Sequence, residues 1–114
     1  MYIYKVGTKM KEKLIKGFEK LINSDVIKNI YPMIDHIDIT SVDEHPLYAG
    51  NILSIKIYLN DPSINEDNMY ELNFDPHWLT EHHIKEFSKY LGLDLVKIYF
   101  SVYGPDNNLI TYWG

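Results

Sequence analysis

Cysteine is absent from the 114-residue chain, and so is arginine. Without cysteine there can be no disulfide framework, no thiolate nucleophile and no thiolate metal site, which excludes a disulfide-stapled secreted scaffold and favours a reducing compartment. Arginine supplies the planar, bidentate contacts that proteins use for phosphates and guanine edges. Its absence therefore argues against nucleic-acid recognition.

Long apolar runs and linkers are missing as well. No apolar run reaches the length of a membrane span, and the lysine-rich start of the chain has no apolar core of a signal peptide. We therefore expect a cytoplasmic protein with no membrane partner. No repeat and no Gly/Ser- or Pro-rich linker divides the chain, and 46% of its residues are hydrophobic, so the sequence predicts a single α+β domain over residues 1–114.

Charge is divided unevenly along the chain. Residues 1–28 carry a net charge of +4 and residues 29–114 carry −9, which gives −5 in total. The field of the acidic part repels nucleic acid and favours a basic partner protein. We expect the acidic loops to meet on one edge of the fold and to steer that partner into contact. The loop acids are Asp43, Glu44, Asp61, Glu66 and Asp67, and Asp75 joins them at a predicted helix start.

Apolar periodicity predicts two main helices. Thr8 is expected to cap the first, after a short strand at residues 2–6, and Ser24 with Asp25 to cap a further turn that ends at Tyr31. The apolar stripe of the first helix consists of Met10, Leu14, Phe18 and Leu21. The second helix is expected to have Asp75 as its cap, Pro76 as its first residue and Gly92 as its stop.

Alternation of apolar and polar residues predicts five strands. They cover residues 34–42, 52–60, 68–74, 95–103 and 109–113. The element order is then α-β-β-β-α-β-β. This order predicts an α+β fold, a two-layer sandwich with a mostly antiparallel four- to five-stranded sheet and both helices on one face.

One face of such a sheet turns away from the helices. The alternation predicts that the residues facing the helices are Ile57, Ile98, Phe100, Val102, Ile110 and Tyr112. The residues predicted to face outward are Tyr58, Tyr99, Tyr103 and Trp113, together with Lys56 and Lys97. Aromatic side chains are enriched at binding interfaces because they combine a large rigid contact area with a polar tip. We therefore expect the four outward aromatic residues to anchor a partner protein.

The leading hypothesis is a non-enzymatic, cofactor-free protein-binding module that uses this aromatic face and the acidic loops. By analogy of class, small acidic domains without motifs are often inhibitors, immunity proteins or phage or bacterial accessory proteins. Two alternatives use the same face. One is a self-associating structural domain, a homodimer, and the other is stacking of single-stranded bases on the aromatic rings, which the negative charge disfavours.

A small metal-assisted or acid–base hydrolase is a further alternative. A polar cluster at the start of the second helix consists of Asp75, His77, Glu81, His82 and His83. His36 and Asp38, on one face of a strand, could complete a metal site, and His36–Asp38 or His45–Glu44 could act as an acid–base pair. The cluster lacks the His-Glu-x-x-His spacing, and no nucleophile motif or phosphate loop accompanies it. The sequence therefore assigns no catalytic and no metal-binding residue.

Overall fold

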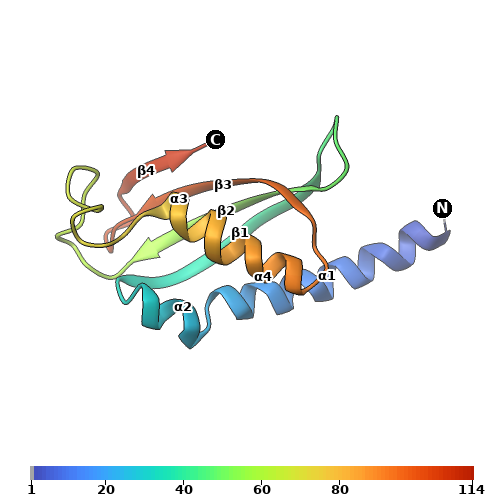
Figure 1. The fold of residues 1–114 in the computed structure, drawn as a ribbon, viewed down its shortest axis with the longest axis horizontal. Helices are drawn as coiled ribbons and strands as arrows, with labels where there is room; N and C mark the ends of the chain where they lie inside the picture. The colour runs from blue at the N-terminus through green and yellow to red at the C-terminus, as the bar shows by residue number, and fades with distance from the viewer. Residues whose placement is uncertain (1) are drawn as a thin grey trace.

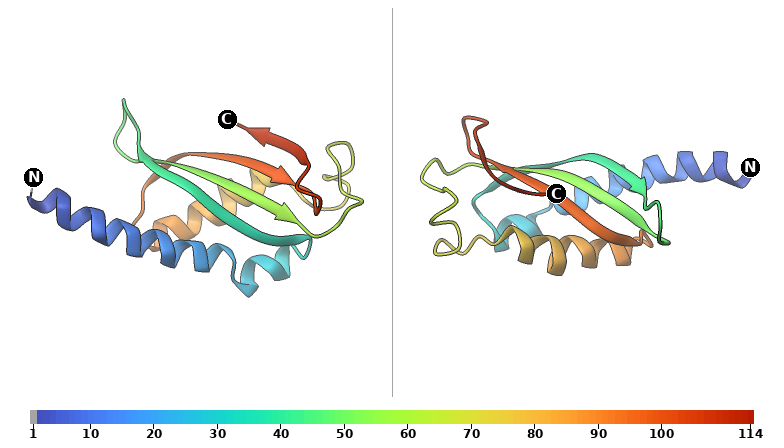
Figure 2. Two further views of the ribbon diagram at one scale, coloured as in Figure 1. Left: turned by 180° about the vertical axis from the view of Figure 1, so that it is seen from behind. Right: turned by 90° about the horizontal axis from the view of Figure 1, so that it is seen from above.

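The structure is a computed structural model that describes the backbone of residues 2–114 and the side chains of residues 12–114. Two helical segments lie on one face of a four-stranded sheet (Figures 1 and 2). This arrangement confirms the predicted two-layer α+β fold. Within the described residues, none of the helices combines the length and the apolar character that a membrane crossing requires.

The sheet has the strand order β1-β2-β3-β4. Its strands are β1 (Ile34–Glu44), β2 (Asn51–Leu59), β3 (Leu95–Tyr103) and β4 (Leu109–Trp113). The pairs β1/β2 and β3/β4 are antiparallel, and β2/β3 is parallel because the chain crosses the helical layer between these two strands. The predicted bounds of the last two strands are confirmed, and those of the first two are correct to within two residues.

The predicted strand at residues 68–74 is wrong, because this segment forms consecutive turns. The amide of Leu72 donates to the carbonyl of Asn68 (3.1 Å), and that of Phe74 donates to the carbonyl of Met69 (2.9 Å). Met69 and Phe74 are buried, whereas Tyr70 and Leu72 are exposed. The apolar alternation of the segment therefore does not correspond to the two faces of a sheet.

The first helix, α1 (Tyr2–Ile22), begins at Tyr2, so the predicted strand at residues 2–6 and the cap at Thr8 are wrong. In the sequence, Val6 and Met10 continue the four-residue spacing of Leu14, Phe18 and Ile22. This spacing favours one long helix, and its first half projects beyond the end of the sheet (Figure 1). The short helix α2 (Asp25–Ile30) follows where expected, but the buried hydroxyl of Ser24 forms no hydrogen bond with any described residue.

The second helical segment runs without interruption through α3 (Pro76–Trp78), the π-helical turn η1 (Leu79–Ile84) and α4 (Lys85–Tyr90). Asp75 caps it by accepting hydrogen bonds from the amides of His77 (2.9 Å) and Trp78 (3.3 Å). Gly92 ends it at a φ of +76°, which is favourable for a residue without a side chain. The predicted cap at Asp75 and the predicted stop at Gly92 are thus confirmed.

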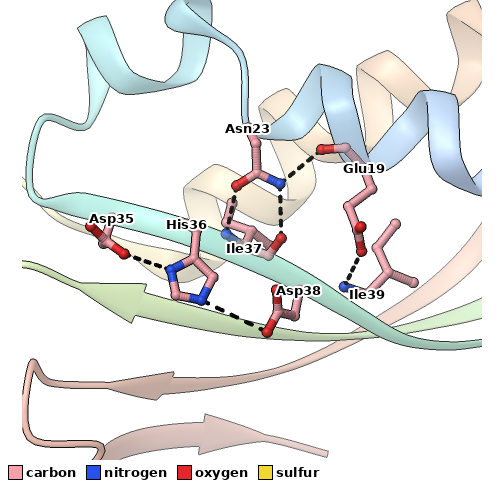
Figure 3. A network of polar contacts seen from close by, with 7 residues as sticks. All are labelled: Glu19, Asn23, Asp35, His36, Ile37, Asp38 and Ile39. Carbon is pink, nitrogen blue, oxygen red and sulfur yellow. Dashed lines mark hydrogen bonds and ion pairs between the residues drawn. The ribbon is translucent and has the colours of Figure 1, made fainter.

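A polar link fixes α1 against the outer edge of β1 (Figure 3). The side chain of Asn23 accepts a hydrogen bond from the amide of Ile37 (2.7 Å) and donates to the carbonyl of the same residue (2.8 Å). The carboxylate of Glu19 accepts from the amide of Ile39 (3.0 Å). These bonds use backbone groups that an edge strand would otherwise leave open to another chain. One edge of the sheet is therefore covered by the protein's own helix.

Candidate functional site

The sheet face opposite the helices carries four tyrosines, and we call it the tyrosine face. Its tyrosines are Tyr58, Tyr99, Tyr103 and Tyr112. Tyr58 pairs with Tyr103 across β2 and β3, and Tyr112 pairs with Ser101 across β3 and β4. Within the described residues, no helix covers this face (Figure 2). The outward placement predicted for Tyr58, Tyr99 and Tyr103 is therefore confirmed.

Three rings form a continuous stack across this face. The His36 ring lies 4.5 Å from that of Tyr58 at an interplanar angle of 12°, and Tyr58 lies 5.2 Å from Tyr103 at 20°. The stack follows from the strand register, because His36 is opposite Tyr58 in the β1/β2 hairpin. Cross-strand neighbours on one face come close enough for aromatic side chains to pack.

Two carboxylates orient the histidine of the stack (Figure 3). Nδ1 of His36 lies 2.6 Å from Oδ2 of Asp35, and Nε2 lies 3.8 Å from Oδ2 of Asp38. A carboxylate thus lies beside each ring nitrogen, and the His36 side chain is still 46% exposed. Such a pre-positioned aromatic group loses little conformational entropy when a partner covers it.

Two lysines lie over rings of the tyrosine face. Nζ of Lys56 is 5.7 Å from the ring centroid of Tyr103, and Nζ of Lys97 is 5.7 Å from that of Tyr99. At this distance the ammonium group is attracted by the negative face of the ring. The predicted association of these lysines with the aromatic face is confirmed.

A shallow hollow lies on each side of the stack. The first has a volume of about 350 Å³, and its lining includes Ser54, Lys56, Tyr99, Tyr103, Leu109 and Tyr112. The second has a volume of about 310 Å³, and its lining includes Asp35, His36, Tyr58, Asn60, Gly104 and Asn107. Each hollow combines aromatic rings with a few polar groups, a mixture that suits side chains of a partner.

The prediction for the outward side of β4 is wrong. Trp113 is opposite Phe100 in the register and lies on the helix side, where its ring is 5.2 Å from that of His77. The cause is a β-bulge: Val102 pairs with Thr111 and Tyr103 with Leu109, which leaves Ile110 as an extra residue. Ile110 packs against the core as predicted, but beyond it the alternation is reversed. Tyr112, predicted to face inward, is consequently 71% exposed on the tyrosine face.

The acidic loops do not meet on one edge as predicted. Glu44 is opposite Asn51 at one end of the β1/β2 hairpin, so Asp43 and Glu44 lie at that end. Asp61 follows the opposite end of β2 and begins the segment that contains Glu66 and Asp67. The carboxylate of Asp61 accepts hydrogen bonds from the hydroxyl (2.6 Å) and the amide (2.9 Å) of Ser63, and these bonds lower its pKa.

The histidines do not converge on one cleft. His36 and Asp38 lie on the tyrosine face, whereas His77 packs on the helix side against Phe100. His82 packs on Trp78 and His83 on Tyr31. Among the residues that the structure describes, no three His, Asp or Glu side chains are placed to hold a metal ion. A site that brings His36 and Asp38 together with the helix histidines is therefore not formed, although His36 and Asp38 lie side by side on the tyrosine face as predicted.

Comparison of the chain with models of protein families, with curated proteins and with solved structures found no match. A function for the chain must therefore be argued from the chemistry of its surfaces. On the tyrosine face, that chemistry consists of stacked rings, lysines held over rings and two shallow hollows.

Proposed function

We propose that the chain is a non-enzymatic protein-binding module whose tyrosine face docks on a basic surface of a partner protein. The observation that carries this proposal is the uncovered stack of His36, Tyr58 and Tyr103. Tyrosine is enriched among the residues that dominate binding energy, because its ring fills a pocket while its hydroxyl finds a hydrogen bond. The two hollows beside the stack offer room for side chains of the partner.

Charge favours a basic partner. The part of the chain that forms the sheet and the second helical segment, residues 29–114, carries a net charge of −9. Strand β1, which borders the tyrosine face, ends with Asp43 and Glu44 and presents Asp35 and Asp38 beside the stack. Acidic groups around an aromatic centre attract a basic protein and speed its association.

A role as an inhibitor is consistent with this surface. Enzymes that act on nucleic acids need basic surfaces, since contacts with phosphates dominate nucleic-acid affinity. A small acidic module that covers such a surface competes with the nucleic acid. In this proposal, the chain is an immunity-type inhibitor or a phage or bacterial accessory protein that masks a basic enzyme.

The test is a binding measurement with single-residue variants. The partner is recovered from the native host with the full chain as bait and then purified, and its affinity for each variant is measured by titration calorimetry. We expect Tyr58→Ala and Tyr103→Ala each to lower the affinity at least about ten-fold, because a central aromatic anchor contributes at least 1–2 kcal/mol. Tyr90→Ala removes an 86% exposed ring from α4, on the other layer, and should change the affinity less than about two-fold.

Three outcomes would contradict the proposal. If Tyr90→Ala lowers the affinity for the partner while Tyr58→Ala and Tyr103→Ala do not, the docking surface lies on the helices. A wild-type homodimer that Tyr58→Ala converts to a folded monomer makes the tyrosine face a self-association surface instead. Binding of a single-stranded oligonucleotide that is lost in the same variants favours base stacking. Tyr112→Ala, at the most exposed of the four tyrosines, serves if Tyr58→Ala fails to fold.

A further inference from the structure

An aromatic pocket lies in the helical layer, between α2, the turns of residues 65–74 and the start of α3. Its volume is about 300 Å³, and it is lined by Tyr31, Tyr70, Asn73, Phe74, Asp75 and Trp78. Four of the six lining residues are aromatic, and Asp75 is the one carboxylate among them. Tyr70 lies in the segment that the alternation predicts as a strand, and Trp78 belongs to no motif, so the sequence does not predict the pocket.

The pocket has a buried floor and an exposed rim. Tyr31 is 4% exposed and Phe74 is fully buried, and their rings meet edge to face at 6.0 Å. Tyr70 and Trp78 are each 54% exposed. Two large exposed rings above two buried ones form a surface that a ligand can cover without unfolding the protein.

The two oxygens of the Asp75 carboxylate differ in their contacts. Its Oδ1 atom accepts the capping hydrogen bonds from His77 and Trp78, while Oδ2 takes no hydrogen bond from the described residues. Its negative charge also acts on the pocket, because the pKa of Tyr31 is raised by burial and further by the charge of Asp75. A cation in the pocket would be attracted both by this charge and by the negative faces of the rings.

The stretch of chain that supplies most of the pocket lining is acidic. Between Lys56 and Lys85 the chain contains no lysine. The carboxylates of this stretch are Asp61, Glu66, Asp67, Glu71, Asp75 and Glu81. One carboxylate is enough to bind a single small cation. Several carboxylates spread along the chain are better matched by a protein segment that carries several positive charges.

We propose that this pocket holds a lysine or arginine side chain of a basic protein segment, whose neighbouring charges lie against the surrounding carboxylates. Aromatic rings together with a carboxylate are the groups that bind ammonium and guanidinium ions in proteins. The pocket lies on the layer opposite the tyrosine face, so this proposal does not depend on the function proposed above.

The test uses the two indole N–H signals of the chain in an ¹⁵N–¹H spectrum. Trp78 lines the pocket, whereas Trp113 packs against His77 and also lines the hollow beside Tyr99 and Tyr112, so its signal reports binding at the tyrosine face. The ¹⁵N-labelled full chain is titrated with an alternating glycine–lysine peptide, with its glycine–arginine counterpart and with N-acetyl-lysine methylamide. We expect the Trp78 signal to shift with both peptides while the Trp113 signal stays in place, and the single amino-acid derivative to bind at least about ten-fold more weakly.

Two variants separate pocket binding from general charge attraction. Asp75→Asn keeps a good helix cap and removes the charge, and Tyr70→Ala removes one exposed ring. Each should lower the affinity for the peptides about five-fold or more. Asp106→Asn removes the same charge from the β3–β4 turn, outside the pocket, and should change the affinity less than about two-fold.

Any of three results would overturn the proposal. The first is an equally small loss of peptide affinity in Asp75→Asn and in Asp106→Asn, which indicates unspecific charge attraction. The second is a shift of both indole signals that persists unchanged in Asp75→Asn, which places the peptides on the tyrosine face instead of in the pocket. The third is binding of the amino-acid derivative as tight as that of the peptides, which assigns the pocket to a free organic cation rather than to a protein segment.

Discussion

Tyr31 is a buried phenol beside the carboxylate of Asp75. Burial, and then the negative charge of Asp75, raise its pKa above the ordinary tyrosine value of about 10. In the unfolded chain both influences are lost. Because the folded state disfavours the ionised form, the stability linked to Tyr31 is complete below the unfolded pKa and is lost as the pH rises toward the folded pKa.

We therefore expect Tyr31→Phe to unfold with nearly the wild-type free energy at pH 8 and to be less sensitive to alkali. Phenylalanine keeps the ring that packs on Phe74 and has no proton to lose. Urea unfolding at pH 8 and between about pH 10 and 11 measures the effect. Tyr90→Phe, at an exposed position, should follow the wild type at each pH. Equal alkaline losses in all three proteins would contradict the pKa direction.

At the scale of elements, one amide side chain makes most of the polar bonds between the end of α1 and β1, and Glu19 adds one more. Asn23 bonds both the amide and the carbonyl of Ile37 and also the carbonyl of Glu19 (Figure 3). Asn23→Ala leaves the partly buried amide and carbonyl of Ile37 without this partner, whereas the carbonyl of Glu19 keeps the hydrogen bond from the backbone amide of residue 23 (3.2 Å). We expect the substitution to lower the free energy of unfolding by about 2 kcal/mol.

Urea unfolding of Asn23→Ala and of a matched control tests this link. Asn29→Ala removes the same side chain from an exposed position of α2 and should cost less than about 0.5 kcal/mol. Hydrogen exchange at the amide of Ile37 gives a second measurement, since this amide donates to Asn23 and should lose protection. A wild-type exchange rate at Ile37 in Asn23→Ala would show that the edge does not depend on the link.

The sequence predicts most of the elements, because their signals are local. Asp75, Pro76 and Gly92 delimit a helix by backbone chemistry alone, and the alternation in residues 95–103 is regular. Where an irregularity changes the period, prediction from the sequence fails. The bulge at Ile110 reverses the faces of Tyr112 and Trp113.

Two further features of the fold could not be predicted from the sequence pattern. In η1, Leu79 and Ile84 are both fully buried although they are five residues apart, since a π-helical turn brings such residues to one face. In residues 68–74, the apolar alternation occurs by chance in a turn segment that the core holds through Met69 and Phe74. The tyrosine face could be foreseen in large part because β2 and β3 are regular, while the aromatic pocket could not, since it depends on these turns.

For the molecule as a whole, the two layers separate the two surfaces proposed to bind partners. The tyrosine face lies on one side of the sheet, and the aromatic pocket lies in the helical layer on the other. The chain extends over 50 × 29 × 24 Å, with the basic helix α1 at one end of the long axis (Figure 1). A partner on one surface therefore leaves the other free.

Acidic groups at both ends of the β1/β2 hairpin should steer a basic partner from a distance. We expect two double variants to associate more slowly than the wild type with the partner proposed for the tyrosine face. They are Asp43→Lys/Glu44→Lys and Glu66→Lys/Asp67→Lys. Each changes the formal net charge from −5 to −1. Long-range attraction acts on the association rate, so the dissociation rate should stay close to the wild-type value if these side chains lie outside the contact.

Stopped-flow measurements over a range of salt concentrations distinguish steering from contact. At about 1 M salt the Debye length falls to about 3 Å, so the association rates of both variants should converge on that of the wild type. Because the two pairs lie at opposite ends of the hairpin and carry the same charge change, the pair that slows association more marks the end nearer to the docking surface. Association rates equal to the wild-type rate at low salt would contradict steering by either end.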